Sequence, residues 1–421
     1  MALAEAVAQF TRALDQMARL PGTPALRREQ IKLQVALITP LIHVKGYAAA
    51  ETKAAAEQAR LLIEQAEALG EPPEDPLLLF SVLATFWAAN LVAFNGDVVC
   101  DLAAQLLALA EKQRATVPLM IGHRLMGQSL LLTGDIAEGR AHLDQAIALY
   151  NPVEHRSLAA RFGQDFGVVA LSFRSFALWL LGYPEAALRD VNDSLKNTRE
   201  MGQAATLMYA LAHAAIPYTL CGNRAAATTQ AQELVTLAEE KGASFWKAFG
   251  TMNQGSVLAL TGQASDAVQV LTSGLTAYRS TGATVWIPAV LSYLVRAHAK
   301  LGQFDDAWRC IDEAMSTVAT TKERWCEAEV YRMAGEIALM SSNSDPAKAQ
   351  AYFELALTVA RAQQAKSWEL RVAMSMARLW RDQGKPQQAR ELLAPIYGWF
   401  TEGFDTLDLK EAKALLDELA S

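Results

Sequence analysis

Tryptophan side chains recur in this 421-residue chain at a spacing that could bind a flat or extended partner. Trp246, Trp286 and Trp368 each lie 16 residues before a glycine at which a helix is expected to end, and Trp325 follows the same phase. Tryptophan offers a large contact area with few rotatable bonds, so an exposed column of these rings along one edge would suit a peptide ligand. Packing between repeats explains the same column, and both interpretations stay open.

A second set of residues is expected on the inner face of the helices that carry the tryptophans. The set is apolar in its middle part and basic towards the C-terminal end, where arginines could hold a carboxylate or an acidic segment. Arginines in structural salt bridges explain the basic end equally well. The set comprises Trp179, Tyr209, Phe249, Ser256, Arg296, Tyr331, Arg371 and Arg378.

Catalytic motifs do not occur in the sequence. It contains neither GxxxxGK[ST] nor GxGxxG, the glycine-rich loops that bind phosphates, and it has no GxSxG nucleophile turn. The six histidines are scattered, and the four cysteines (Cys100, Cys221, Cys310 and Cys326) form no CxxC pair. This arrangement predicts no metal site and no disulfide framework. We therefore expect a non-catalytic protein without a cofactor.

Glycines at a fixed spacing define the helices that must position these side chains. Seven of them, from Gly182 to Gly302, recur every 20 residues, and alternate members share a context such as LLGYPEAA or LTGQASDA. Glycine commonly ends a helix because it adopts the left-handed conformation without steric cost. The resulting period of 40 predicts two helices of about 16 residues per repeat, each about 24 Å long.

Small residues follow the turn glycines at fixed offsets of five and twelve. They let the two helices of a pair cross closely, and Gly127 and Gly255 occupy the matching place on first helices. This is the pattern of tetratricopeptide repeats. It predicts an all-α, right-handed superhelical solenoid of about 20 helices in about 40-residue repeats. The residues at the offset of five are Ala187, Ala227, Ala267, Ala307 and Ala389.

Three parts are expected along the chain. Residues 1–20 match only the second helix of a repeat, residues 21–402 form the solenoid, and residues 403–421 form a closing helix with a polar outer face. The chain thus starts in mid-repeat, which indicates a piece of a longer parent; an N-terminal capping helix is the alternative. About nine first helices should start near Ala25, Pro76, Val117, His155, Gln203, Ala243, Ala283, Thr321 and Ala365.

One interval breaks the period, because Gly134 and Gly182 lie 48 residues apart instead of 40. The eight additional residues fall within the segment NPVEHRSLAARFGQDFG, which contains one proline and two glycines. A bent connection at this point could present His155, Arg161 and Asp165 to a ligand. A longer helix or an ordinary surface loop is the plainer explanation.

Composition excludes several classes of protein. With 52% hydrophobic residues and a net charge of −7, the chain is too apolar for disorder and too acidic for a general nucleic-acid or anionic-membrane surface. Its N-terminus lacks the features of a signal peptide. Residues 76–96 are uncharged and long enough to span a bilayer, but their acidic flank and their polar interruptions favour a buried inner helix. We expect a cytoplasmic location and no membrane contact.

Four segments are more specific than a generic repeat: 161–188, 243–263, 323–339 and above all 365–419, which reads AKSWELRVAMSMARLWRDQGKPQQARELLAPIYGWFTEGFDTLDLKEAKALLDEL. Together they resemble the C-terminal tetratricopeptide-repeat region of large bacterial signalling proteins. In those proteins a class III adenylate/guanylate cyclase domain, or a winged-helix DNA-binding domain, precedes an AAA-type ATPase module. The resemblance implies a sensor or scaffold, similar in layout to the maltose-responsive transcription activators. It transfers no catalytic residue to this chain.

The function expected from these observations is recognition of a protein or peptide partner by a non-catalytic scaffold. Effector domains attached at the N-terminus and a second copy of the chain are further candidate partners. The alternative function is a small-molecule sensor that binds a metabolite in the superhelix groove. A purely architectural or dimerising module is the third hypothesis.

Overall fold

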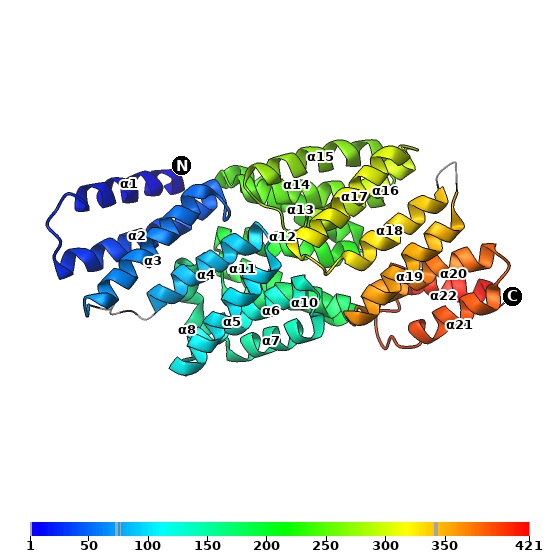
Figure 1. Ribbon diagram of the computed structural model, residues 1–421, viewed down its shortest axis with the longest axis horizontal. Helices are drawn as coiled ribbons and strands as arrows, with labels where there is room; N and C mark the ends of the chain where they lie inside the picture. Colours follow the sequence, from blue (N-terminus) through cyan, green and yellow to red (C-terminus); the bar gives the residue numbers. More distant parts are fainter. Residues whose placement is uncertain (1, 72–74, 76, 341–343, 421) are drawn as a thin grey trace.

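The computed structural model describes residues 2–71, 75, 77–340 and 344–420, and within these ranges it contains helices and no strand. Antiparallel helix pairs stack side by side, with the N-terminal helices at one end of the molecule and the C-terminal helices at the other (Figure 1). The prediction of an all-α solenoid of tetratricopeptide-like helix pairs is confirmed. Residues 1 and 421 of the predicted terminal segments lie outside the described residues.

Nine helix pairs occur within the described ranges. Their first helices start within six residues of the predicted positions, except for the fourth, which was expected near His155 and starts at Phe166. Pro76, the predicted start of the second, lies outside the described residues. The first helices are α2 (Pro24–Lys45), α4 (Leu77–Val92), α6 (Thr116–Thr133), α10 (Phe166–Leu180), α12 (Ala204–Leu220), α14 (Ser244–Leu260), α16 (Ile287–Lys300), α18 (Glu327–Met340) and α20 (Lys366–Asp382).

The second helices pack on the outside of the first ones. Helix α1 (Ala2–Met17) lies against α2, and α22 (Leu407–Glu418) closes the stack with Leu409, Ala412 and Leu415 buried and its charged residues largely outside. The second helices are α3 (Ala50–Ala68), α5 (Gly96–Gln113), α7 (Ile136–Leu149), α11 (Pro184–Met201), α13 (Arg224–Lys241), α15 (Ala264–Ser280), α17 (Phe304–Thr321), α19 (Pro346–Ala362) and α21 (Pro386–Tyr397).

The glycines take the roles that their spacing predicts. The seven from Gly182 to Gly302 all adopt φ between 64° and 90°, the left-handed region in which a side chain is strained. Gly127 of α6 instead serves the crossing with α7, because a Cβ atom there would lie only 2.8 Å from the carbonyl oxygen of Gly139. The small residues therefore let the paired helices approach backbone to backbone.

Successive turns of the superhelix touch each other. The C-terminal end of a first helix rests on the start of a first helix one turn later, and backbone or side-chain hydrogen bonds join the two levels. Partners in one of these contacts are 188 residues apart, so a turn takes between four and five repeats of 40 residues. The bonds run from Thr284 N to Val92 O (2.8 Å), from Arg324 N to Leu132 O (2.9 Å) and from Ser367 Oγ to Trp179 O (2.5 Å).

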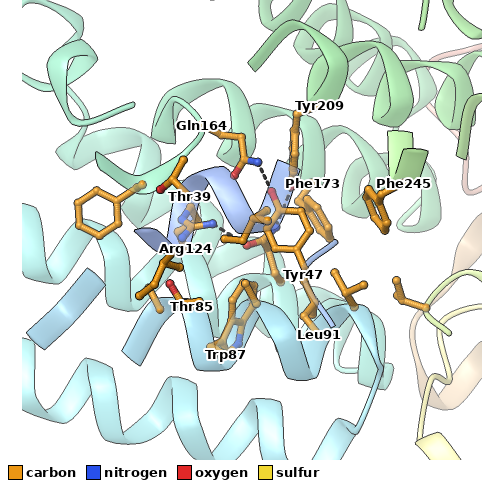
Figure 2. Close-up of a pocket in the computed structure, with 18 of the residues that line it drawn as sticks. Thr39, Tyr47, Thr85, Trp87, Leu91, Arg124, Gln164, Phe173, Tyr209 and Phe245 are labelled. Atoms are coloured by element: carbon orange, nitrogen blue, oxygen red, sulfur yellow. Dashed lines mark hydrogen bonds between the residues drawn. The ribbon is translucent and has the colours of Figure 1, made fainter. Parts of the chain in front are cut away.

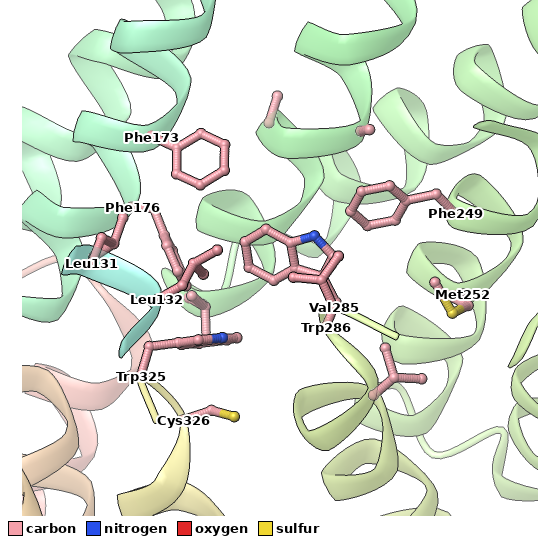
Figure 3. Packing of buried hydrophobic residues seen from close by; sticks show 14 of the residues in the cluster. Leu131, Leu132, Phe173, Phe176, Phe249, Met252, Val285, Trp286, Trp325 and Cys326 are labelled. Atoms are coloured by element: carbon pink, nitrogen blue, oxygen red, sulfur yellow. The ribbon is translucent and has the colours of Figure 1, made fainter. Parts of the chain in front are cut away.

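The tryptophan column lies between these turns and does not form an exposed rim. Trp246, Trp286, Trp325 and Trp368 are at most 5% exposed. In Figure 3, the rings of Trp286 and Trp325 lie among buried side chains of several helices, and the centroid of Phe176 is 4.5 Å from that of Trp325. The interpretation as packing is thus correct, but the tryptophans connect whole superhelical turns as well as neighbouring repeats.

The uncharged segment that could have spanned a membrane forms α4 and is largely buried. Eight of its side chains are inaccessible to solvent, among them Phe80 and Trp87. Within the part of the chain that the structure describes, no helix combines the length and apolarity that a membrane span requires.

A buried carboxylate holds the start of α16 in place. Glu323 is fully buried, and its side chain accepts hydrogen bonds from the backbone N–H of Trp286 (2.9 and 3.2 Å) and from the indole N–H of Trp325 (2.9 Å). Trp286 adopts φ 73°, a conformation that strains a residue with a side chain by about 1–3 kcal/mol. The carboxylate therefore offsets local strain at the centre of the tryptophan column.

The burial of Glu323 predicts a pH-dependent stability. Burial raises the pKa of Glu323 from 4.5 to about 7, so the folded protein retains a proton that the unfolded chain releases, and stability falls as pH rises between these values. Tyr278 and Cys326 lie beside it and stay neutral in this range, because burial raises their pKa further. Urea unfolding at pH 5 and pH 8 should show a loss about 2–3 kcal/mol larger in the wild type than in Glu323→Gln. Equal losses would contradict this assignment.

Candidate functional site

Two neighbouring, partly open cavities are lined mainly by first helices of the described part of the chain. The C-terminal cavity has a volume of about 560 Å³ and is lined mainly by α12, α14, α16, α18, α20 and α22. The N-terminal pocket has a volume of about 90 Å³ and is lined mainly by α2, α4, α6, α10, α12 and α14. Phe249 and Trp286 belong to the walls of both, so an aromatic layer separates them. These cavities are the candidate binding sites of the chain.

The C-terminal cavity gathers most of the residues that were predicted for the groove. Trp179 and Tyr331 do not reach it: Trp179 is buried behind Arg371, and Tyr331 lies in a shallow depression between α17 and α18. Tyr209 lines the N-terminal pocket instead. The predicted residues that do line the C-terminal cavity are Phe249, Ser256, Arg296, Arg371 and Arg378, together with Trp286, Trp325 and Trp368.

Each acidic side chain of the C-terminal cavity is paired with an arginine. Arg332 forms a bidentate pair with Glu329, with both contacts at 2.7 Å, and a further contact of 3.0 Å with Glu336. Burial opposes ionisation of Glu329, but the Arg332 guanidinium holds the pKa of this carboxyl below its usual value. The other two carboxylates come from α22, where Asp408 pairs with Arg371 at 2.8 Å and Glu411 with Arg378 at 3.1 Å.

Three basic side chains of the same cavity have no ion pair with a described residue. Six basic and four acidic side chains line it, and the pairs just described use Arg332, Arg371 and Arg378. The other three form no side-chain hydrogen bond or ion pair with any described residue, and Arg296 and Lys300 are exposed to solvent at the cavity wall. Arg371 and Arg378 therefore form structural salt bridges, which was one of the two explanations for the basic end of the set. Arg296 forms none with a described residue and is available to hold an anion. The unpaired cations are Arg224, Arg296 and Lys300.

The N-terminal pocket is polar on one side and aromatic on the other. Gln164 donates to the hydroxyl of Tyr47, and Gln128 donates to the hydroxyl of Tyr209 at 3.2 Å (Figure 2). Arg124 of α6 points into the same space and donates from Nη1 to Gln128 at 3.2 Å. Burial lowers the pKa of Arg124 to about 10, so its guanidinium keeps the charge at neutral pH. The aromatic side includes Phe173, Phe245 and Trp246, whereas Trp87 lies beside Arg124.

The irregular interval supplies part of this pocket. Its residues form α8 (Pro152–His155), the 3-10 turn η1 (Arg156–Leu158) and α9 (Ala159–Phe162), so it is a bent connection and not a longer helix. Arg161 lines the pocket and is paired with Asp75 at 2.6 Å. Asp165 instead caps α10, and His155 is buried with Nδ1 accepting from the backbone N–H of Asn151.

Sequence reasoning missed the polar residues of the N-terminal pocket. Tyr47, Arg124 and Gln164 lie in three separate segments, and no repeat offset connects them. The available signal was a single arginine within the otherwise apolar stretch of α6, TVPLMIGHRLMGQSLLLT. An isolated charge on an otherwise apolar first helix indicates a polar site inside the solenoid, because a buried charge normally has a partner.

Two histidines that are distant in the sequence meet in the structure. The Nδ1 atoms of His123 on α6 and His142 on α7 lie 2.9 Å apart. Burial lowers the pKa of both imidazoles, and the neighbouring His142 lowers that of His123 further. Within the described residues no third histidine, cysteine or carboxylate joins them to form a metal-binding group. The contact is therefore explained by packing between α6 and α7.

Comparison with known proteins shows the fold. No protein-family model and no curated protein sequence matches the chain. Among solved structures, it is similar to a Rap protein complexed with competence and sporulation factor, with a TM-score of 0.60 and 12% identity over 93% of this chain and 99% of that one.

Two further solved structures share the same helical-repeat fold. NprR in complex with its cognate peptide NprX has a TM-score of 0.53 and 14% identity, over 81% of this chain and 94% of that one. The Rap conjugation gene regulator of the plasmid pLS20, in complex with the Phr* peptide, has a TM-score of 0.52 and 11% identity, over 93% and 96%. At these identities the likeness extends to the helical-repeat architecture over nearly the full length.

Proposed function

We propose that this chain is a non-catalytic scaffold that binds a peptide or a protein segment in its C-terminal cavity. The observation that carries the proposal is Arg296, a cation that forms no hydrogen bond or ion pair with a described residue and lies on the wall of a cavity of about 560 Å³. A carboxylate of the partner, from an acidic side chain or from its C-terminus, would pair with Arg296. A charge-assisted hydrogen bond of this kind contributes about 1.5–3 kcal/mol.

The walls of the cavity suit an extended segment. Apolar side chains that are partly or fully exposed, such as Ile216, Leu260 and Met340, supply contact area on these walls. Polar groups such as Asn253 and Ser292 lie on the same walls. Every carboxylate among the described residues of the cavity wall is paired with an arginine, which supports a binding role over a catalytic one. Two solved structures with the same fold carry bound peptides, the Rap conjugation gene regulator of the plasmid pLS20 and NprR, and they support the same class of ligand.

The resemblance of residues 365–419 to the C-terminal region of cyclase–ATPase signalling proteins supports a regulatory context. In this setting the scaffold would transmit occupancy of its cavity to an attached or separate effector. The net charge of −7 agrees with a protein partner instead of a nucleic acid.

A selection experiment tests the C-terminal cavity. Short random peptides displayed on phage are enriched on the wild-type chain, and enriched sequences are resynthesised with a fluorophore for polarisation measurements. Arg296→Met should weaken binding about 10-fold or more, through loss of the charge-assisted contact. Ser292→Trp, which fills the cavity from α16, should weaken it at least as much.

Arg124→Met is the matched control, because it removes an arginine from the other cavity. Its affinity for the enriched peptides should stay within about twofold of the wild type. If no peptide is enriched, or if neither Arg296→Met nor Ser292→Trp changes the affinity, the cavity is not a peptide site and the proposed function is wrong.

A further inference from the structure

The N-terminal pocket has more hydrogen-bond donors than acceptors. The hydroxyl oxygens of Tyr47 and Tyr209 accept from Gln164 and Gln128, and neither hydroxyl hydrogen has an acceptor among the described residues. The guanidinium of Arg124 makes one hydrogen bond, and its buried Nε atom has no partner there. A tyrosine hydroxyl can donate once and an arginine five times, so the pocket presents several unused donors.

The positive charge of the pocket is not neutralised. Among the described residues that line it there is no aspartate or glutamate, and of its two arginines only Arg161 forms an ion pair with a described residue. Arg124 instead stacks against aromatic rings, with its guanidinium carbon 5.1 Å from the centroid of Phe166 and 5.7 Å from that of Trp87. Arg124 is partly buried, and a charge that is withdrawn from water without a partner loses favourable solvation. An anion in the pocket would satisfy both the charge and the free donors.

The size and the walls of the pocket restrict what that anion can be. The pocket volume of about 90 Å³ is smaller than the roughly 150 Å³ of an apolar cavity that takes up benzene, so the space admits at most one small ring. The side opposite Arg124 is aromatic, with Phe173, Phe245 and Trp246, and such rings pack edge to face with another ring. A carboxylate matches the planar donor fork of arginine.

We propose that the N-terminal pocket binds a single-ring aromatic monocarboxylate, with the carboxylate on Arg124 and the hydroxyls of Tyr47 and Tyr209, and with the ring among the aromatic side chains. This site is distinct from the C-terminal cavity, and it does not depend on the peptide-binding function. The layer of Phe249 and Trp286 forms the wall between the two spaces. Free acid is favoured over the end of a peptide, because the pocket is too small for a chain of residues.

Isothermal titration calorimetry with defined probes tests this site. Benzoate, 4-hydroxybenzoate and phenylacetate are titrated into the full chain, with benzamide and phenylacetamide as neutral analogues and an acetylated dipeptide ending in phenylalanine as the peptide-derived carboxylate. At least one free acid should bind with a Kd below about 1 mM. Its amide and the dipeptide should bind at least about tenfold more weakly.

Two variants and one control connect the affinity to named groups. Arg124→Met should weaken the acid at least about tenfold, and Tyr47→Phe, which removes only a hydroxyl, about threefold or more. Arg296→Met, the same substitution in the C-terminal cavity, should leave the acid's affinity within about twofold. Because Arg124 has no ion-pair partner without ligand, Arg124→Met should not lower the Tm of the ligand-free protein.

Three outcomes would overturn the proposal. They are the absence of binding by every acid below about 10 mM, equal binding of an acid and its amide, and unchanged affinity in both Arg124→Met and Tyr47→Phe. A marked fall in the Tm of Arg124→Met would assign Arg124 a structural role; Tyr47→Phe then decides the case. Loss of peptide binding in Arg296→Met with intact acid binding separates this site from the proposed function.

Discussion

Replacing Arg371 by methionine is expected to lower the free energy of unfolding by about 3–5 kcal/mol. The Arg371 side chain is 19% exposed and donates to Asp408 at 2.8 Å and to the carbonyl of Leu220 at 2.9 Å. Its guanidinium also stacks between Trp179 and Trp368, at 5.0 and 5.2 Å from the ring centroids. Without it, Asp408 is left in a largely buried position without the guanidinium that pairs with it, and α22 loses the link to α12 that runs through Arg371. Urea denaturation followed by far-ultraviolet circular dichroism measures the change.

The expected loss depends on the charge left behind, so a double-mutant cycle isolates it. Arg371→Met combined with Asp408→Leu should recover most of the stability, because replacing both members of a buried pair by apolar groups is often neutral. Arg296→Met serves as the control, since Arg296 has no ion pair with a described residue, and it should change the free energy by about 0.5 kcal/mol or less. A double variant as unstable as Arg371→Met would show that the stacking and the carbonyl contact dominate instead.

The helices could be predicted from the sequence, whereas the pitch of the superhelix could not. Turn glycines and small residues at helix crossings act within one repeat, so their spacing is visible in a single chain. The contact between Thr284 and Val92 depends instead on small rotations that accumulate over more than four repeats. For this reason the tryptophan column could be placed at the starts of first helices, but not recognised as the layer between two turns.

The candidate site was predictable to the extent that it follows the repeat. Phe249, Ser256 and Arg296 lie at regular offsets from turn glycines and line the C-terminal cavity as expected. The partners of Arg371 and Arg378 lie on α22, outside the repeat pattern, so the sequence could not tell a paired arginine from a free one. The N-terminal pocket draws on the irregular interval and on the loop before α3, where no offset applies.

Truncating Trp325 to alanine should destabilise the protein by about 3–5 kcal/mol, the cost of emptying a large buried aromatic position. Trp325 is 2% exposed, and its ring contacts Phe176 of α10, Trp286 and Trp368. Its indole N–H also donates to Glu323, so the substitution removes one of the hydrogen bonds that this buried carboxylate accepts. Urea unfolding at constant pH measures the loss of stability.

The location of the effect follows from the contact between turns. In an open solenoid each repeat touches only its neighbours, and a lesion at the start of α18 would weaken α16, α18 and α20. Here the ring of Phe176 lies 4.5 Å from that of Trp325, although α10 belongs to a repeat one turn earlier. Hydrogen exchange followed by mass spectrometry should therefore show faster exchange in α10 as well as in α18.

Trp308→Ala is the control, at a half-buried tryptophan of α17 whose ring packs against Tyr352 of α19. It should lower the free energy of unfolding by less than Trp325→Ala and accelerate exchange only around those two helices. If α10 keeps its protection in Trp325→Ala, the turns are energetically independent, and the tryptophan layer does not couple the two halves of the molecule.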